Sequence, residues 1–479
     1  MPVPWCAASP ERPYVLKCAA GWFCFFAGSF LGAGCAPSTK KSQPISQFPA
    51  APIYPPEHRY SLDDLIALSI HRNAGLDVAR YEAEAVQGLV DQVKALWLPQ
   101  FRFDFAALAY DNDLSYEARA FGLATINVPI TGTYNFVNSL AFSQILYTGG
   151  KRTSGLKQAK MYAEIKRLDV LRIQDAVAFD VANYYHLVCL TNDIDVVLED
   201  AVRRLRVFRH VADNLTRRGS LRSSNLDRLQ ADYFISQLDQ FRVLVQAGRQ
   251  QAYEALKHFV GLGREESMPL RQVSLPPAMT ASEMISAYEN VVEGFSKRPE
   301  ARQLDLFTEI RKEQVKFAKA AWNPNVLILG SYVDTQGSNN SIFGAIDGLI
   351  ASLVVDLPIY DAGRLGKLRE ALGFEQASLA FQRQFEELIT LEIKVTAIDA
   401  QKALANEMKA ARARAAGMEH YDATRQAYSR ELVPASAVAT AIGLDMLAKI
   451  QHLQTLYAYH DSRARLKRVT VDREVQYGY

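Results

Sequence analysis

The chain has 479 residues, more than one compact core usually supports, so two or more domains or an elongated molecule are expected. Its 54 Lys and Arg residues and 52 Asp and Glu residues leave a formal charge of +2, which gives no support to a nucleic-acid-binding protein. A charged fraction of 22% and a mean hydropathy of −0.09 argue against a membrane protein made of many apolar helices, a collagen and a disordered chain.

Residues 1–34 are typical of a secretory signal peptide. A basic stretch that ends at Lys17 precedes a charge-free run of apolar and small residues. The run contains Leu31-Gly32-Ala33-Gly34-Cys35, which resembles a bacterial lipoprotein signal, although Gly32 stands where Leu is usual. The resemblance implies that Cys35 becomes the lipidated first residue and, because Ala36 follows it, that the protein is sorted to the outer membrane. An ordinary signal peptide cut nearby, or no cleavage, is the alternative.

Residues 35–60 are expected to form a tether behind the lipid. Six prolines lie between positions 37 and 56, with Ser, Lys and Gln between them. Such a segment favours the extended polyproline II conformation, at about 3.1 Å per residue. By that figure the tether reaches roughly 75 Å, so the anchor need not lie beside the domain that follows.

The rest of the chain reads as one unit used twice, at 61–279 and 280–470, followed by a C-terminal tail at 471–479. Asn73 and Arg298 are 225 positions apart, and so are Pro99 and Pro324. Each unit reads as a helix, a region of two strands, a very long helix, a turn and a further helix.

Two uninterrupted helical patterns are expected at about 154–217 and 365–428. The first contains no proline, and its apolar residues recur at helical spacing. About 64 residues at 1.5 Å each span roughly 95 Å, which predicts coiled-coil packing of antiparallel hairpins. A solvated rod or scaffold made only of helices is the alternative.

Four strands are expected, at about 99–112, 134–147, 325–335 and 348–358. In the first, Phe101, Phe103 and Phe105 alternate with Arg102 and Asp104, which indicates one apolar and one polar face. Residues 120–150 carry no charge and are expected to form a loop and then a strand.

Each of these strands is long enough to cross a bilayer when tilted. Because about eight strands are needed to close a membrane barrel, several chains must share one barrel. A soluble sheet that caps a helical rod is the alternative.

These features together resemble the TolC-like outer-membrane factors, in their lipoprotein branch. The motifs that carry the resemblance are Leu62-Asp63-Asp64-Leu65 with Asn73, Leu98-Pro99-Gln100, Tyr147-Thr148-Gly149-Gly150-Lys151-Arg152, Arg217-Arg218-Gly219-Ser220, Arg298-Pro299-Glu300 and Leu357-Pro358-Ile359-Tyr360-Asp361-Ala362-Gly363-Arg364. The resemblance implies a mainly helical fold with a membrane β-barrel part. Three copies would form a 12-stranded outer-membrane barrel, continued by a periplasmic helical tunnel.

The implied function is the passive exit duct of a tripartite efflux system for drugs, toxic compounds or metal ions. Its partners would be an inner-membrane transporter and a periplasmic adaptor. Two alternatives remain: the exit duct of a type I protein-secretion system, and a lipoprotein scaffold that conducts nothing.

In the family, the tunnel narrows where the long helices turn. The resemblance assigns this aperture to residues at both turns, namely Gly219, Asn225, Tyr428, Leu432, Pro434, Ala437 and Thr440. Family members often carry acidic rings after the second turn, but residues 432–444 have no charge. Asn225 stands at the position of a locking Asp and is able to bond Tyr428 but not to form an ion pair. We therefore expect a closed state held by hydrogen bonds and apolar packing, with weak cation selectivity.

Glycines mark the expected turns from strand to helix, at Gly149, Gly150 and Gly363. No arrangement of a nucleophile and a base indicates an enzyme, and no cofactor is expected. His186 and Cys189 lie three positions apart on the first long helix, but two ligands do not make a closed metal site, so packing is the better interpretation.

Overall fold

A computed structural model describes residues 52, 54, 55, 58–109, 111, 114–120, 124–131, 133–218, 225–263, 265–278, 298–337, 348–430 and 432–470. Side chains are not described at 114–120, 124–131, 135 and 470. The signal peptide, Cys35, most of the tether, Gly219 and the C-terminal tail lie outside these ranges. The helices are α1 (Leu62–Arg72), α2 (Ala74–Ala95), α3 (Lys151–Arg217), α4 (Asn225–Val260), α7 (Pro299–Ala320), α8 (Ala362–Ser429) and α9 (Ala435–Thr470). None of the helices within the described ranges is long and apolar enough to cross a membrane.

The internal duplication is visible in the lengths of the helices. α2 and α7 have 22 residues each, and α4 and α9 have 36 residues each. The two long helices, α3 and α8, have 67 and 68 residues. The predicted pair of long helices is therefore confirmed.

Short polar side chains set the helix starts. Ser61 and Asp64 form a reciprocal capping box at α1, in which each side chain bonds the other residue's backbone N–H. Asn73 begins α2 by accepting a hydrogen bond from the backbone N–H of Leu76 at 3.1 Å. Its side-chain amide also donates to the backbone oxygen of Phe259 at 2.7 Å, which ties the start of α2 to the end of α4.

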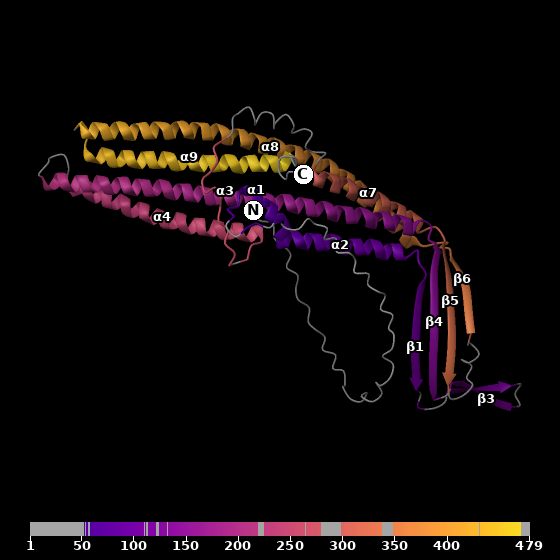
Figure 1. The fold of residues 1–479 in the computed structure, drawn as a ribbon. Coiled ribbons are helices and arrows are strands. Elements are labelled where there is room, and N and C mark those ends of the chain that lie inside the picture. The colour runs from indigo at the N-terminus through magenta and orange to yellow at the C-terminus, as the bar shows by residue number, and fades with distance from the viewer. Residues whose placement is uncertain are drawn as a thin grey trace. The chain divides into compact units, whose positions relative to one another are not determined.

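Four strands form one antiparallel sheet in the order β1-β4-β5-β6 (Figure 1). They are β1 (Gln100–Ala109), β4 (Tyr134–Tyr147), β5 (Asn325–Gly337) and β6 (Gly348–Asp356). The first and last of these strands are slightly shorter than the ranges read from the sequence. β1 and β5 begin 225 positions apart, so the offset of the duplication continues from the helices into the sheet.

A second, two-stranded antiparallel sheet joins β2 (Leu114–Ala120) to β3 (Ala124–Thr131). The expectation of a loop directly before the strand at 134–147 was wrong for this segment. β3 contains Thr125, Ile126, Val128, Ile130 and Thr131, which are β-branched residues that favour extended backbone.

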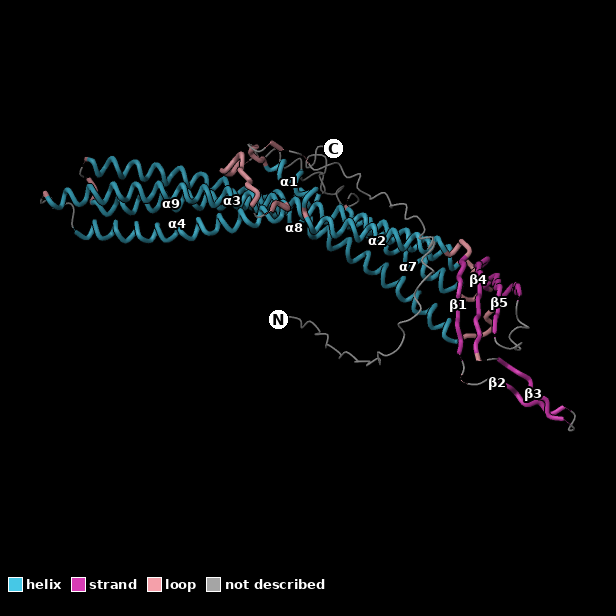
Figure 2. Tube along the Cα trace, turned by 60° about the horizontal axis from the view of Figure 1, so that its bottom comes forward, coloured by secondary structure: helices cyan, strands magenta, loops and turns pink. Residues whose placement is uncertain are grey.

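α3 is the central helix of the packing. It packs against α2 and α7 along one part of its length and against α4 and α9 along another, while α8 packs against α7 and α9 (Figure 2). The largest fully buried side chains include Leu65, Leu76, Leu256, Met268 and Tyr459. The main core thus lies where α1 and the segment after α4 cover the middle of α3 and α9.

Candidate channel-forming surfaces

The four-stranded sheet has two free edges within the described part of the chain. β4 and β5 each pair on both sides, whereas β1 pairs only with β4 and β6 only with β5. An edge strand presents a row of backbone N–H and C=O groups that seek partners. The sheet is therefore incomplete as it stands in one copy.

The register gives this sheet one mostly apolar face. Phe103 on β1 lies opposite Leu140 on β4, which lies opposite Tyr332 on β5. The exposed apolar side chains on this face are Phe101, Phe103, Phe105, Phe136, Leu140, Tyr332, Leu349, Leu353 and Val355. Asn138 lies on the same face, between Phe136 and Leu140 and opposite Phe105, and its amide donates to Asp334 at 3.4 Å, so one polar pair interrupts the apolar residues.

The opposite face of the sheet is hollowed and more polar. Its hollow has a volume of about 840 Å³. The side chains of this face that line it are Gln100, Arg102, Ala141, Ser143, Leu329, Ser331, Ile350 and Ser352. The sheet thus curves so that its polar face is inside and its aromatic face outside.

Glycine permits the close contact at the first turn from strand to helix. Gly149 has φ 63°, and a Cβ placed there would lie 2.2 Å from the Cβ of Asn323. The Asn323 side chain donates to the Gly149 oxygen at 2.8 Å. Gly150 follows with φ 99° and begins α3, while Gly363 donates its backbone N–H to Asp361 at the start of α8.

An arginine near the start of each long helix holds its turn. Arg152 on α3 donates to the backbone oxygen of Leu96, at the end of α2, at 3.0 Å and stacks over Trp97. In the second half, Arg364 on α8 donates to the backbone oxygen of Ala321, at the end of α7. Leu96 and Ala321 are again 225 positions apart. In each repeat, therefore, an arginine joins the start of the long helix to the end of the shorter helix that precedes the strands.

α8 exposes an apolar stripe along one flank. Its members recur at spacings of three, four and seven, which is the pattern of a coiled-coil seam. They are Phe374, Phe381, Leu388, Leu391, Val395 and Ile398, each about half exposed. Polar residues such as Arg383, Glu387 and Gln401 occupy another exposed flank, so the apolar flank is distinct.

The helices pack as a row, in the order α2-α3-α7-α8 along one part of α3 and α4-α3-α9-α8 along the other. α2 and α4, at the end of the row opposite α8, also expose apolar side chains. α2 packs on α3 and exposes Val78, Tyr81 and Leu89. On α4 the exposed apolar side chains are Leu226, Leu229, Tyr233, Phe241, Val243 and Leu244. Both free ends of the helical row are therefore apolar, as are the outward side chains of the edge strands.

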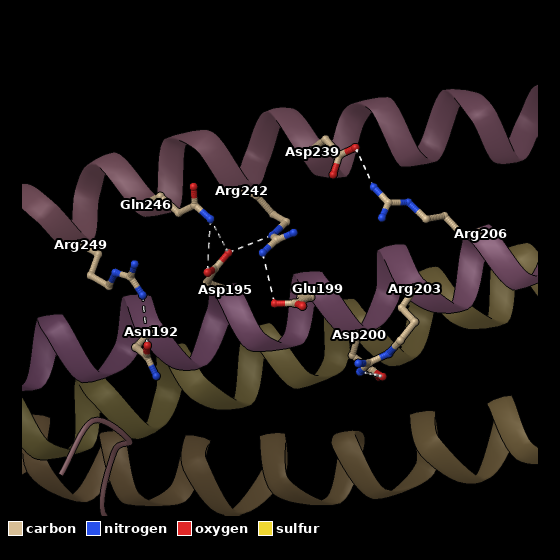
Figure 3. Close-up of polar contacts among 10 residues, drawn as sticks. All are labelled: Asn192, Asp195, Glu199, Asp200, Arg203, Arg206, Asp239, Arg242, Gln246 and Arg249. Carbon is tan, nitrogen blue, oxygen red and sulfur yellow. Dashed lines mark hydrogen bonds and ion pairs between the residues drawn. The ribbon is translucent and has the colours of Figure 1, made fainter.

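Charged and amide side chains join α3 to α4 along the hairpin (Figure 3). Asp195 accepts from Arg242 at 3.0 Å, and the same guanidinium reaches Glu199 at 3.3 Å. Further rungs are Asn192 with Arg249 at 3.2 Å, Arg206 with Asp239 at 3.7 Å and Arg209 with Asp232 at 3.0 Å. This ladder fixes the register of the two antiparallel helices.

A buried ion pair joins the two hairpins. Arg204 on α3 contacts Asp445 on α9 at 3.0 Å, and Lys449 contacts the same carboxylate at 2.6 Å. The Asp445 side chain is 3% exposed. Arg204 also lies over the ring of Tyr421 on α8, 4.6 Å from its centroid, so one guanidinium touches three helices. Asp200 completes the cluster; burial opposes its ionisation, but hydrogen bonds from Arg203 and Arg204 keep its pKa below the usual value.

His186 and Cys189 face different partners and share no ligand. The ring of His186 stacks on His460 at a centroid distance of 5.0 Å, while the Cys189 thiol points to the backbone oxygen of Gln272 at 3.7 Å. Burial lowers the pKa of His186 to about 4 and raises that of Cys189 to about 12. Among the described residues no group of three or more His, Cys, Asp or Glu side chains is placed to hold a metal ion.

No family model matches the chain, and no curated protein matches it in sequence. Solved structures do match. The outer-membrane channel OprN aligns with a TM-score of 0.70 and 18% identity, over 87% of this chain and 93% of its own. The outer-membrane protein VceC of Vibrio cholerae gives 0.70 and 14%, over 85% and 95%. The CmeC outer-membrane channel of Campylobacter jejuni gives 0.69 and 12%, over 85% of both chains.

The chain has the fold of the outer-membrane channels. The fold that the TolC-like resemblance implies is thereby confirmed: long antiparallel helical hairpins, and a four-stranded sheet that fits a share of a barrel.

The residues that the resemblance assigns to an aperture lie at or near the two helical turns. Gly219 is outside the described residues, and Asn225 begins α4. Leu432 is 73% exposed, and Pro434 precedes α9. Further along α9, Thr440 is exposed and Ala437 is half-buried.

The hydrogen bond considered between Asn225 and Tyr428 is not formed within the chain. The Asn225 oxygen accepts from Arg228 at 3.0 Å, and the buried Tyr428 hydroxyl has no hydrogen-bond partner among the described residues. Arg228 lies one turn along the same helix, so its guanidinium is close enough to donate to the Asn225 side-chain oxygen. The ion pair of Arg204 and Asp445, which the sequence analysis missed, joins the hairpins instead. The only hint of this ion pair in the sequence was that Asp445 is the first charged residue after the uncharged residues 432–444.

Proposed function

We propose that the protein is one subunit of a homotrimeric outer-membrane channel and the passive exit duct of an efflux system. The observation that carries this proposal is that the free edges of the sheet and the exposed apolar flanks of the helices lie at the same two ends of the subunit. Among the described strands, β1 and β6 each have one edge without a backbone partner, and the helices at the same ends of the row, α2 and α8, have exposed apolar flanks.

Backbone groups at a sheet edge cannot face lipid unpaired, so a membrane sheet must close on itself. Four strands are too few for this, and three copies supply twelve. Pairing of β1 with the neighbour's β6 closes the sheet, with the aromatic face toward lipid and the hollowed polar face toward the lumen. The same head-to-tail contact covers the apolar stripe of α8 with the apolar flanks of α2 and α4.

The long helices then form the tunnel that carries cargo through the periplasm, and the residues at its turns narrow its end. Cys35 carries the lipid, and the tether links this anchor to α1. An inner-membrane transporter supplies the energy, and a periplasmic adaptor joins it to the duct. Drugs, other toxic small molecules or metal ions are the proposed cargo.

Cellular accumulation tests this proposal. Cells without the protein should retain a fluorescent small-molecule efflux substrate, and cells with the restored chain should release it. Crosslinking in cells, followed by mass spectrometry, should capture an inner-membrane transporter together with an adaptor. Unchanged accumulation and no captured transporter would contradict an efflux role, whereas capture of a protein-secretion transporter would favour the secretion duct.

A further inference from the structure

One exposed face of α9 carries no charged side chain over several turns. Its members follow at spacings of three and four residues, so they form one stripe along the helix. They are Thr440, Leu444, Leu447, Gln451, Gln454 and Ala458. Leu444 is 49% exposed and Leu447 is 48% exposed. The stripe runs for about 27 Å at 1.5 Å per residue.

The nearest charges on α9 are turned away from this stripe. Asp445 lies beside Leu444 in sequence but is 3% exposed, because it pairs with Arg204. Lys449, at 17%, is bound to the same carboxylate. The Thr440 hydroxyl donates to the backbone oxygen of Ser436 at 3.1 Å, so its polar group is satisfied within the helix. The buried ion pair therefore leaves only uncharged side chains on the exposed face of this part of α9.

α9 does not lie at a free end of the helical row. The Arg204–Asp445 pair holds it to α3, and the contact of His452 with Glu407 at 3.2 Å holds it to α8. Its exposed leucines are thus not required for contact with another copy. In a closed ring of helices, the exposed stripe of α9 therefore faces either the lumen or the outside of the ring.

We propose that Leu444 and Leu447 form an apolar constriction of the tunnel, three copies of each making a ring above the aperture. This inference rests on the proposed channel and continues the face that begins at Ala437 and Thr440. A narrow ring of leucines resists wetting, so it hinders hydrated ions and lets uncharged or apolar cargo pass. Selectivity then comes from exclusion of water and not from a ring of acids.

Planar-bilayer recordings of the full-length protein test the constriction. Leu444→Ser with Leu447→Ser should raise the conductance of the closed channel several-fold, because polar side chains keep the ring wet. The matched control is Leu444→Met with Leu447→Met, which keeps the ring apolar and should leave the conductance unchanged. The mass of each detergent-extracted complex shows whether assembly is retained.

Chemical modification gives a second readout. Leu444→Cys should react with a charged methanethiosulfonate reagent, and the reaction should change the current. The unsubstituted protein, treated with the same reagent, is the control, because Cys189 is fully buried but Cys35 reacts as well wherever its thiol carries no lipid. If the serine variant conducts like wild type and the cysteine variant reacts without a change in current, the stripe faces outward and the inference is wrong. A wild-type protein that forms no channel would overturn the proposed function as well.

Discussion

Arg204 and Asp445 are 241 positions apart in sequence, yet the Arg204 Nη1 and the Asp445 Oδ2 lie 3.0 Å apart. Each residue belongs to a different repeat and a different hairpin. The pair joins the first helical hairpin to the second at a point where the carboxylate is almost fully buried. It is therefore a specific link between the two halves of the duplicated chain.

Loss of Arg204 should weaken this link. Arg204→Leu leaves the buried Asp445 with Lys449 as its remaining charged partner, and we expect a loss of about 2 kcal/mol in stability. The adjacent Arg203 is 67% exposed and also pairs with Asp200, so Arg203→Leu should cost less than about 1 kcal/mol. Thermal unfolding at one fixed protein concentration compares the two variants. Equal losses of stability in the two variants would show that the buried pair of Arg204 contributes no more than the exposed pair of Arg203.

The apolar stripe of α8 should be needed for assembly. Ile398 is 58% exposed in one chain, and Ile398→Glu places a charge in the proposed contact between copies. Thr390→Glu adds the same charge at an exposed position two residues from Leu388, on another side of the helix, and should be tolerated. Native mass spectrometry of the detergent-extracted protein should show monomers for the first variant and trimers for the second. Trimers in both cases would place the subunit contact elsewhere.

Gly149 should be intolerant of a side chain. An added Cβ would lie 3.0 Å from the Ala320 backbone oxygen and closer still to Asn323, and φ is positive. Gly149→Ala should cost about 1–3 kcal/mol. Gly155 lies in α3 with nothing within 4 Å of an added Cβ, so Gly155→Ala should stabilise by about 0.5–1 kcal/mol. Urea denaturation measures both, and the opposite order would refute the close contact.

The duplication made much of the fold predictable. Pro99 and Pro324 each lie four residues after the end of a helix, and a strand starts at the next residue, so the repeated motif located β1 and β5 together. The β2–β3 sheet was missed although Leu114, Tyr116 and Ala118 alternate with Ser115, Glu117 and Arg119 in β2. β3 gave a weaker signal, because it lies in the charge-free run from 120 to 150 and its apolar and polar residues alternate less regularly.

The contacts between the halves were not predictable from sequence. Arg204 sits among several arginines of α3, and its neighbours Arg203 and Arg206 reach other partners. Only the packing of α3 against α9 selects Arg204 for Asp445. The bond considered between Asn225 and Tyr428 failed for a related reason, because local helical geometry gave Asn225 a nearer donor in Arg228.

The buried histidine pair predicts acid sensitivity. Burial, together with the nearby His460 and Arg463, lowers the pKa of His186 to about 4. The folded pKa is below the unfolded value near 6.5, so this stability is complete above pH 6.5 and is lost as the pH falls toward 4. The loss from His186 is on the order of 3 kcal/mol.

Thermal unfolding between pH 7.5 and pH 4.5 measures this effect. His186→Phe should lower the pH dependence, whereas His420→Gln, at an exposed position on α8, should leave it unchanged. A wild-type midpoint that does not fall with pH would show that the pair is not held neutral.

Single-channel recording of the purified full-length protein in a planar lipid bilayer tests the central claim most directly. Three copies that close one barrel should give discrete current steps of uniform size, and Ile398→Glu should abolish them. A protein that inserts into the bilayer, or binds it through its lipid, without producing steps would contradict the exit duct and favour a scaffold that conducts nothing.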